Sequence, residues 1–337
     1  MHIDTAAVEV GFGYTKTAYR KPNREIKIGS FPSLAPIHQS SIISQSISHG
    51  PTRRIYTISV NNKQYDVGPD VSLSVGGGNH NHGRYLNDDF PNTDNYIALV
   101  LGALVEMGAT EVDCLVLGLP VKTMKKYSEL LKQTFTNVFN VNNVRIRIRH
   151  VKVIPQPVGT LIHYAAKNPQ KISSNVTNLV IDPGYVTTDW VVATGYHIID
   201  SRSDGNLTGI STILKNTART IAADHDKKFD RIDRLDNALR TGTPLSIFNE
   251  VIANETLWAY ARQNTPLIEE CLGEIITSVG SMDDISNVIL TGGGAKYYEF
   301  AAKRIFKNTP VIINDDSSNG NAIGFLFIGE STQAQHA

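Results

Sequence analysis

The hydrophobic pattern of the 337-residue chain alternates between short apolar runs and longer stretches of helical periodicity. The apolar runs predict strands at residues 6–10, 16–20, 56–60, 64–67, 112–120, 151–154, 178–181, 189–193, 196–200, 287–290 and 311–313. The periodic stretches predict helices at residues 94–107, 124–139, 157–166, 209–224, 231–240, 245–279, 298–306 and 321–328, the sixth of them broken at Pro266. We expect Asp94 to cap the first helix, Gly108 to end it, and the tail from Ser331 to be disordered. Strands that alternate with helices indicate an α/β protein with sheets covered on both faces.

Composition and charge exclude several classes of protein. Apolar residues make up 41% and charged residues 19% of the chain, which is typical of a folded globular protein. Lys and Arg together number 32, as do Asp and Glu, so the chain lacks the excess positive charge that broad nucleic-acid binding requires. One basic stretch, Arg145–Arg149, alternates with isoleucine and predicts a strand with a basic face at a solvated edge of a sheet.

Neither a membrane span nor a signal peptide is expected. The longest apolar stretch, residues 97–105, is interrupted by Gly102 and is shorter than the roughly 20 residues that a span needs. The N-terminal sequence lacks the basic and apolar segments of a signal peptide, so we expect a cytoplasmic protein with no membrane partner. Cys114 and Cys271 are too few for a disulfide framework and lie in apolar sequence, which predicts buried free thiols.

Two strand–turn–strand segments, near Val8 and near Leu179, form an internal duplication. Each presents an acidic residue, a glycine two positions later and a hydroxylated residue further on. In the first segment, Gly11 and Gly13 allow backbone N–H groups to approach a phosphate chain closely. Thr15 offers a hydroxyl and Lys16 a charge for the β- and γ-phosphates. An ordinary turn is the alternative interpretation of this segment. The segment is not a Walker loop, because the Gly-Lys-Ser/Thr sequence that ends such a loop is missing.

The second segment, Asp182–Asp189, offers a metal ligand. Asp182 follows a buried strand and can hold a hydrated Mg²⁺, which takes only one or two protein carboxylates. Gly184 brings backbone amides to the γ-phosphate, and Thr187 and Thr188 add hydroxyls. A capped surface turn is the alternative interpretation.

A third motif, Leu290–Lys296, places three glycines between a strand and a helix. Gly292, Gly293 and Gly294 allow a flat adenine to lie against the backbone, with the helix N-terminus near the α-phosphate. A glycine-rich turn from strand to helix is common, so this motif indicates nucleotide binding only when it is taken together with the other two motifs.

The three motifs, in this order and about 170 and 110 residues apart, resemble those of the actin superfamily over nearly the whole chain. Residues 153–159 and 319–324 are similar to its two connecting segments. The resemblance implies an α/β actin-like fold of two duplicated ribonuclease-H-like lobes around a nucleotide cleft. Lobe I is expected at 1–160, with an inserted small subdomain at about 30–93, and is completed by 319–332. Lobe II is expected at 161–318, with an inserted helical subdomain at about 205–265.

The resemblance also implies the site residues and cofactors. Gln156 falls where actins carry the glutamine that orients the attacking water, and Asp182 and Glu9 (through water) are the expected Mg²⁺ ligands. The nucleotide, ATP or GTP, is expected to contact Gly11, Gly13, Tyr14, Thr15, Lys16, Gly184, Tyr185, Thr187, Thr188, Gly209, Gly292, Gly293, Gly294 and Lys296. Two positions depart from the family pattern: Glu9 replaces an Asp, and Pro183 replaces a small or apolar residue.

The short chain is most similar to the bacterial and archaeal plasmid-segregation group of the superfamily (the ParM or StbA group). Residues 31–36, 65–68 and 235–242 also resemble that group. The resemblance implies an ATPase that polymerises head to tail with copies of itself and reaches DNA through an adaptor protein, without direct DNA contact. The Gly76–Gly83 loop and the helix near Arg231 are candidate polymer contacts by position.

Two other functions are open on the same fold. A small-molecule kinase would need a catalytic carboxylate in the cleft, and Gln156 at the water-orienting position counts against it. A nucleotide-gated binding module, like a chaperone, would need a second substrate domain. The two histidines of the Gly76–Gly83 loop lack a Cys or carboxylate at ligand spacing, which favours a plain loop over a metal site.

Overall fold

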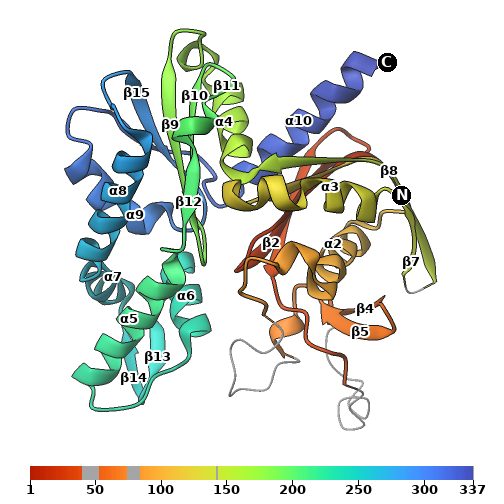
Figure 1. Ribbon diagram of the computed structural model, residues 1–337. Coiled ribbons are helices and arrows are strands. Elements are labelled where there is room, and N and C mark those ends of the chain that lie inside the picture. The colour runs from red at the N-terminus through yellow and green to blue at the C-terminus, as the bar shows by residue number, and fades with distance from the viewer. Residues whose placement is uncertain (40–52, 74–83, 142, 337) are drawn as a thin grey trace. The chain divides into compact units, whose positions relative to one another are not determined.

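The computed structural model describes residues 1–39, 53–73, 84–141 and 143–336 (Figure 1). The chain divides into two compact units. Unit 1 comprises Met1–His163 and Asn321–Ala337, and unit 2 comprises Tyr164–Gly320. Helix α4 (Gln156–Lys167) carries the chain across the first boundary.

Unit 1 is built on a six-stranded sheet of order β3-β2-β1-β6-β8-β7. Its strands are β1 (His2–Val10), β2 (Tyr14–Arg20), β3 (Ile26–Pro32), β6 (Glu111–Leu119), β7 (Val138–Val141) and β8 (Val144–Pro155). The first three strands form antiparallel hairpins, whereas β1, β6 and β8 are parallel. Because parallel strands present their carboxyl ends at one edge of a sheet, the ends of β1 and β8 lie on the same edge.

The helices of unit 1 are α2 (Asp94–Met107), α3 (Met124–Phe135) and α10 (Gly320–His336), which begins where the chain returns from unit 2. The predicted cap at Asp94 is wrong by one residue: Thr93 is the N-cap and its hydroxyl accepts the N–H of Tyr96 at 3.3 Å. Gly108 ends the helix in the left-handed conformation (φ 72°), as predicted. The predicted helix 124–139 ends instead at Phe135, and the chain then enters strand β7.

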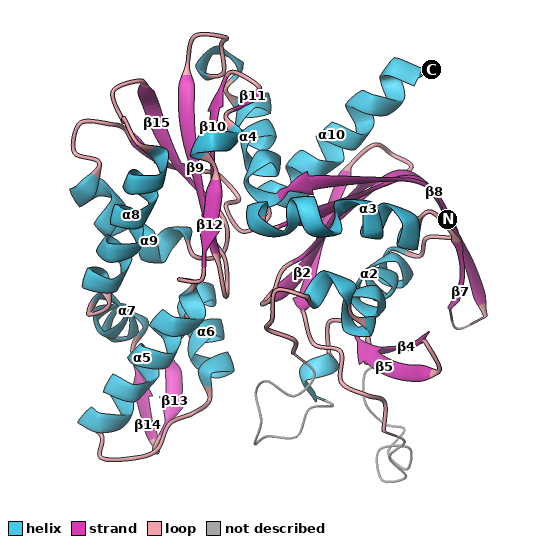
Figure 2. Ribbon diagram, in the orientation of Figure 1, coloured by secondary structure: helices cyan, strands magenta, loops and turns pink. Residues whose placement is uncertain are grey.

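The C-terminal segment is helical for longer than the sequence pattern predicts. Helix α10 reaches His336, beyond the expected end at residue 328, and replaces the tail that was expected to be disordered (Figure 2). Its apolar residues Ala322, Phe325 and Leu326 pack in one buried cluster with residues of β1 and β6. A Cβ on Gly324 would lie 1.7 Å from the carbonyl oxygen of Gly159, so α10 and α4 touch where both carry glycine.

The basic stretch Arg145–Arg149 lies in β8, which pairs with β6 on one side and β7 on the other. The predicted position at the edge of a sheet is therefore wrong. The arginines are exposed and the intervening Ile146 and Ile148 are buried, so the predicted basic face is present on an inner strand.

A separate hairpin of unit 1 joins β4 (Tyr56–Val60) to β5 (Lys63–Val67), as predicted. Its turn residues Asn61 and Asn62 have φ of 48° and 64°, which a type I′ turn requires and asparagine tolerates. The Gly76–Gly83 loop lies outside the described residues.

Unit 2 holds a sheet of order β11-β10-β9-β15-β16, with β12 paired to β10. The strands are β9 (Thr177–Pro183), β10 (Thr188–Thr194), β11 (His197–Ile198), β12 (Asp204–Asn206), β15 (Ile285–Leu290) and β16 (Val311–Ile313). Every residue of β9 is buried, including its polar residues Thr177, Asn178 and Asp182. Its helices are α5 (Ile210–Asp224), α6 (Ile232–Thr241), α7 (Asn254–Arg262), α8 (Thr265–Val279) and α9 (Ala295–Ile305).

The predicted helix 245–279 is wrong in its first part. Residues 245–252 form a hairpin of β13 (Leu245–Ile247) and β14 (Glu250–Ile252), and the helical remainder is divided into α7 and α8. The break falls just before α8, where Pro266 occupies the first turn, a position that suits a residue without an N–H.

Short 3₁₀ turns complete the chain at Val71–Leu73, Phe90–Asn92, Val121–Thr123, Pro169–Lys171 and Asp200–Arg202. Among the described residues, no helix has both the length and the apolar character needed to cross a membrane.

Candidate functional site

The two duplicated segments form hairpins with the same internal register. In unit 1, β1 pairs with β2 so that Glu9 lies opposite Lys16, and the N–H of Gly11 donates to the carbonyl of Tyr14 at 3.1 Å. In unit 2, β9 pairs with β10 so that Asp182 lies opposite Asp189. The N–H of Gly184 donates to the carbonyl of Thr187 at 2.7 Å, as Gly11 does in the first hairpin. Each hairpin therefore places an acid two residues before a glycine turn.

The acid of the first hairpin is buried and fully engaged. Glu9 is 3% exposed, and its Oε2 accepts a hydrogen bond from Lys16 Nζ at 3.1 Å. Its Oε1 accepts a hydrogen bond from Asn321 Nδ2 at 3.0 Å, and Asn321 Oδ1 in turn accepts the hydroxyl of Thr160 at 2.8 Å. The carboxylate of Glu9 thus ties β1 to β2 and to the start of α10.

The turn of the first hairpin is held from its carbonyl side. Arg84 Nη1 donates to the carbonyl oxygens of Phe12 and Gly13 at 2.6 and 2.8 Å, and the N–H of Ser33 also donates to Gly13 at 3.0 Å. The hydroxyl of Thr15, predicted to face a phosphate, is fully buried and lies 2.9 Å from Ser33 Oγ. Arg84 was missed from the sequence because it lies more than seventy residues along the chain in a segment with no motif. Ser33 lies in the motif at residues 31–36 but was not assigned to the site.

The acids of the second hairpin lie together. Asp182 and Asp189 are 5% and 2% exposed, and directly opposite residues of an antiparallel pair share one face of the sheet. The hydroxyl of Thr187 donates to Asp189 Oδ2 at 2.8 Å. The hydroxyl of Thr188 is buried and donates to the carbonyl of Thr208 at 2.6 Å. Asp189 is a further acid at this place that the predicted site did not include.

The glycine motif of unit 2 meets the second hairpin. The N–H of Gly294 donates to the carbonyl of Pro183 at 3.0 Å. A Cβ on Gly292 would lie 2.0 Å from Asp182 Oδ1, and Gly292 has a φ of 71°. A Cβ on Gly293 would meet no atom within 4 Å, so that glycine borders open space. The structure therefore brings Asp182 of the second hairpin and the glycines of the third motif, which are separate in sequence, into one place.

The N-terminus of α5 holds the carbonyls of the second turn. The N–H groups of Ile210 and Ser211 donate to the carbonyls of Gly184 and Tyr185 at 3.0 and 2.8 Å. A Cβ on Gly209 would lie 2.4 Å from the carbonyl carbon of Val186, so only glycine allows this approach. Gly209 is thus in direct contact with the second turn.

Gln156 and Glu9 stand at the same edge of the unit 1 sheet. Gln156 is the first residue of α4, directly after the end of β8, and is 7% exposed. Pro155 before it pairs with Leu119 of β6, and Val8 before Glu9 pairs with Leu117 of the same strand. Glu9 and Gln156 therefore flank the end of β6.

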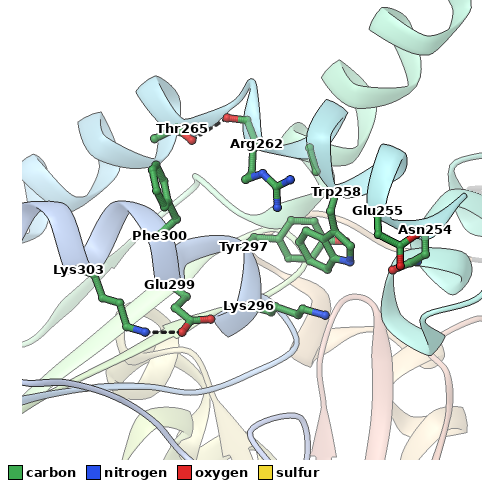
Figure 3. A pocket seen from close by; sticks show the side chains of 11 residues that line it. Asn254, Glu255, Trp258, Arg262, Thr265, Lys296, Tyr297, Glu299, Phe300 and Lys303 are labelled. Carbon is green, nitrogen blue, oxygen red and sulfur yellow. Dashed lines mark hydrogen bonds and ion pairs between the residues drawn. The ribbon is translucent and has the colours of Figure 1, made fainter.

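Lys296 points into a groove between α7 and α9 (Figure 3). The groove has a volume of ≈ 530 Å³, and Lys296 Nζ lies 4.7 Å from the centre of the Trp258 ring. The rings of Trp258 and Tyr297 are 4.7 Å apart. The groove is lined by Asn254, Glu255, Trp258, Ala261, Arg262, Thr265, Lys296, Tyr297, Glu299, Phe300 and Lys303. In this structure the Lys296 ammonium lies against an aromatic ring of α7.

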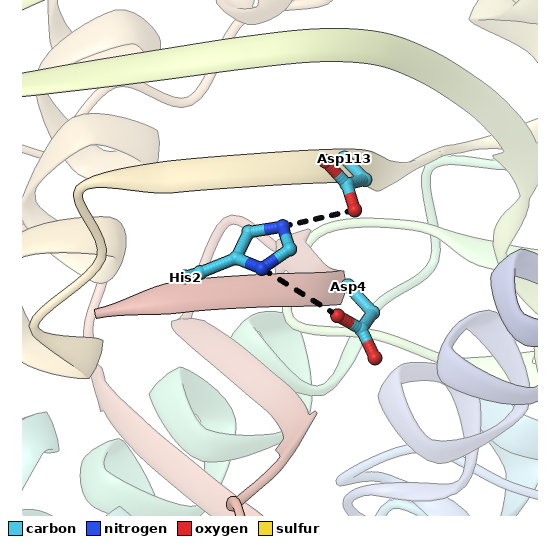
Figure 4. Close-up of side chains that lie close together, drawn as sticks. All are labelled: His2, Asp4 and Asp113. Carbon is cyan, nitrogen blue, oxygen red and sulfur yellow. Dashed lines mark hydrogen bonds and ion pairs between the residues drawn. The ribbon is translucent and has the colours of Figure 1, made fainter.

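A cluster of His2 and Asp4 on β1 and Asp113 on β6 has the composition of a metal site (Figure 4). His2 Nε2 lies 2.9 Å from Asp113, but its other nitrogen, Nδ1, is the one that faces Asp4 at 3.9 Å. Asp113 is also paired with Arg149 at 3.3 Å. At roughly 3.3 Å per residue the cluster is about 20 Å along β1 from Glu9, so it is no part of the hairpin site.

Both cysteines are buried free thiols, as predicted. Burial raises the pKa of the Cys114 thiol and of the Cys271 thiol. Neither thiol is therefore a ready nucleophile.

Comparison with known proteins identifies the fold. Residues 7–159 match the sequence model of the N-terminal domain of actin-like proteins. The structure is similar to Ta0583, an archaeal actin homolog, with a TM-score of 0.75 at 18% identity, covering 98% of this chain and 100% of that one. The complex of Ta0583 with ADP gives a TM-score of 0.73 at 19% identity, with the same shares covered.

A ParM filament structure from Clostridium botulinum is also similar, with a TM-score of 0.71 at 17% identity, covering 98% of this chain and 100% of that one. No curated protein sequence matches the chain. The chain has the actin-like fold, and residues 7–159 are an actin-like N-terminal domain. The actin-like fold that the resemblance of the three motifs implied is confirmed.

Proposed function

We propose that this chain is an actin-like ATPase that binds ATP (or GTP) with Mg²⁺ and polymerises with copies of itself into dynamic filaments. The observation that carries the proposal is the repeated hairpin, in which a buried acid precedes a glycine turn in the same register. In unit 2 that acid also lies against Gly292 of the glycine motif. In this proposal the two lobes are residues 1–160 with 319–332 and residues 161–318.

In the first hairpin the proposed ligand is the phosphate chain. The N–H of Gly13 makes no backbone hydrogen bond within the described part of the chain, so it is available for an anion. Lys16 supplies the positive charge. The two carboxylate oxygens of Glu9 accept hydrogen bonds from Lys16 and Asn321. We therefore favour a role for Glu9 in orienting Lys16, rather than a role as a metal ligand through water.

In the second hairpin the proposed ligand is Mg²⁺. Asp182, with Asp189 on the same face, offers the carboxylate oxygens that this ion prefers, and Mg²⁺ usually keeps several waters besides one or two carboxylates. When bound, the ion neutralises charge on the phosphate oxygens. Asp182 holds its position because Gly292 leaves room for its carboxylate.

For hydrolysis we propose that Gln156 orients the attacking water. Phosphoryl transfer asks mainly for positioning and charge neutralisation, so a neutral amide suffices for this step. The position of Gln156 at the start of α4, on the sheet edge that also carries Glu9, supports the assignment.

Filament formation is proposed from the fold and from its neighbours. Similar structures are described as a 15-stranded ParM filament and as an AlfA filament bound to AMPPNP, each with 16–17% identity to this chain. A head-to-tail contact that does not close on itself produces an open filament. With 32 basic and 32 acidic residues the chain has no net charge, so we propose that DNA is reached through an adaptor protein in plasmid segregation.

Phosphate release from ATP and from GTP, with and without Mg²⁺, tests the enzymatic part. We expect Mg²⁺-dependent release that Gln156→Ala slows while nucleotide affinity stays within about twofold, because the residue acts on water and not on the nucleotide. Tight nucleotide binding without any hydrolysis would favour a nucleotide-gated binding module.

A further inference from the structure

The two glycine turns differ in what holds their carbonyl groups. In the second turn the carbonyls of Gly184 and Tyr185 accept hydrogen bonds from the N-terminus of α5. In the first turn the carbonyl of Phe12, which corresponds to that of Tyr185, and the carbonyl of the next residue, Gly13, accept hydrogen bonds from Arg84. A single side chain of unit 1 thus takes the place that a helix N-terminus takes in unit 2.

The position of Arg84 is set by a cluster of aromatic rings. The ring of Phe12 stacks on that of Phe90 at 5.4 Å, and Tyr85, next to Arg84, stacks on Phe90 at 6.1 Å. Phe90 also meets Tyr96 of α2 edge-on at 5.5 Å. The tip of the turn and the backbone beside Arg84 are therefore fixed to the same rings, which keeps the guanidinium beside the carbonyls.

The orientation of these carbonyls decides where the N–H groups point. In a planar trans peptide the C=O and the following N–H point in opposite directions. Because Arg84 holds the carbonyls of Phe12 and Gly13, the N–H groups of Gly13 and Tyr14 are directed away from Arg84. A guanidinium is always charged and donates in a fixed planar geometry, so it can restrain two adjacent peptide groups at once.

We propose that Arg84 is a positioning residue for nucleotide binding: it fixes the first turn with its N–H groups presented to the phosphates. This inference rests on the proposed function, since it assumes that the first turn binds phosphate. The positive charge of the Arg84 guanidinium beside the turn also favours an anionic ligand. The role corresponds to that of the helix dipole of α5 at the second turn.

Calorimetric titration with MgATP and with MgADP tests the proposal on Arg84→Gln, Arg84→Lys and the wild type. We expect Arg84→Gln to weaken the binding of both nucleotides by about 10- to 100-fold, as for the loss of a charged hydrogen bond, with ATP affected at least as strongly as ADP. Arg84→Lys keeps the charge and a donor, so it should recover part of the affinity. Arg145→Gln is the matched control, because Arg145 is exposed and has no ion pair within the described residues.

Amide hydrogen exchange without nucleotide gives a second readout. Exchange at Gly11 and Ser33, whose N–H groups donate to the carbonyls of Tyr14 and Gly13 at the turn, should be faster in Arg84→Gln than in the wild type, while exchange in β6 is unchanged. Wild-type nucleotide affinity in Arg84→Gln would overturn the role of Arg84. If Arg84→Gln does not fold, Arg84→Lys is used in its place. Nucleotide affinity in Arg84→Lys equal to that in Arg145→Gln, together with wild-type exchange at Gly11 and Ser33, would also overturn the role of Arg84. A wild type that binds no nucleotide would instead remove the proposed function itself.

Discussion

The carboxylate of Asp182 occupies the space where a side chain at position 292 would begin, since a Cβ on Gly292 would lie 2.0 Å from Asp182 Oδ1. Gly292 also has a φ of 71°, where other residues are strained. The acid and the glycine are 110 residues apart in sequence, and any side chain at position 292 would displace the carboxylate. This contact joins the second hairpin to the glycine motif.

Gly292→Ala is therefore expected to destabilise the protein. The backbone conformation alone costs about 1–2 kcal/mol, and displacement of Asp182 adds to it, so the melting temperature should fall by several degrees. Gly293→Ala is the matched variant, because a Cβ there meets nothing within 4 Å. It should melt like the wild type and yet bind nucleotide more weakly, since its methyl group enters the space proposed for the base. Equal melting temperatures of the two variants would contradict the contact with Asp182.

Asp182→Asn tests the proposed metal ligand. The substitution keeps the shape of the side chain and removes its charge, so hydrolysis should fall by at least about 100-fold and depend on much higher Mg²⁺. Steady-state phosphate release over a range of Mg²⁺ concentrations measures both effects. Asp189→Asn, across the hairpin, should show the same direction with a smaller loss. Full activity of Asp182→Asn at ordinary Mg²⁺ would remove the assignment.

Glu9→Gln tests the buried pair of unit 1. Lys16 would keep its charge at 15% side-chain exposure without a carboxylate partner, which costs about 3 kcal/mol or more. Denaturant unfolding measures the loss. Glu330→Gln is the control, because Glu330 of α10 pairs with Arg20 of β2 at side-chain exposures of 31% and 36%, and a pair exposed to solvent contributes less than about 1 kcal/mol. Similar losses in both variants would show that the Glu9 pair gains nothing from burial.

The folded protein is expected to lose stability at high pH because of Tyr56. Burial and the hydrogen bond to Glu106 raise the pKa of Tyr56 to about 12 from its ordinary value near 10. Between these values the folded protein holds a proton that the unfolded chain has released, so stability should fall as the pH rises from about 10 to 12. Melting curves at pH 9, 10 and 11 should show a smaller fall in Tyr56→Phe than in the wild type. Parallel curves for the two proteins would contradict the raised pKa.

The sequence predicted the local structure of the three motifs, because short-range features determine it. The hairpins around Gly11 and Gly184 and the strand-to-helix turn at Gly292–Gly294 are short-range features, and the structure contains each of them. The hydrophobic pattern could not identify the hydrogen-bond partners that come from distant segments of the chain. Arg84 reaches the carbonyls of Phe12 and Gly13 from more than seventy residues away, and no periodicity marks it.

The errors in secondary structure also have local causes. The hairpin of β13 and β14 turns at Phe248 and Asn249, whose φ values are 56° and 64°. A type I′ turn usually carries Asn-Gly or Asp-Gly, and the bulky Phe248 hid the turn inside an apparently helical pattern. In α10 the polar residues after Glu330 ended the apolar pattern, although polar residues are no barrier to helix continuation.

Sedimentation of the purified protein with MgATP tests the central claim most directly. The account predicts that the wild type forms a pellet with MgATP, that EDTA prevents it, and that electron microscopy of the pellet shows filaments. Asp182→Asn should stay in the supernatant under the same conditions. A wild type that remains monomeric at high concentration with MgATP, MgGTP and their non-hydrolysable analogues would contradict the proposal of a filament-forming ATPase.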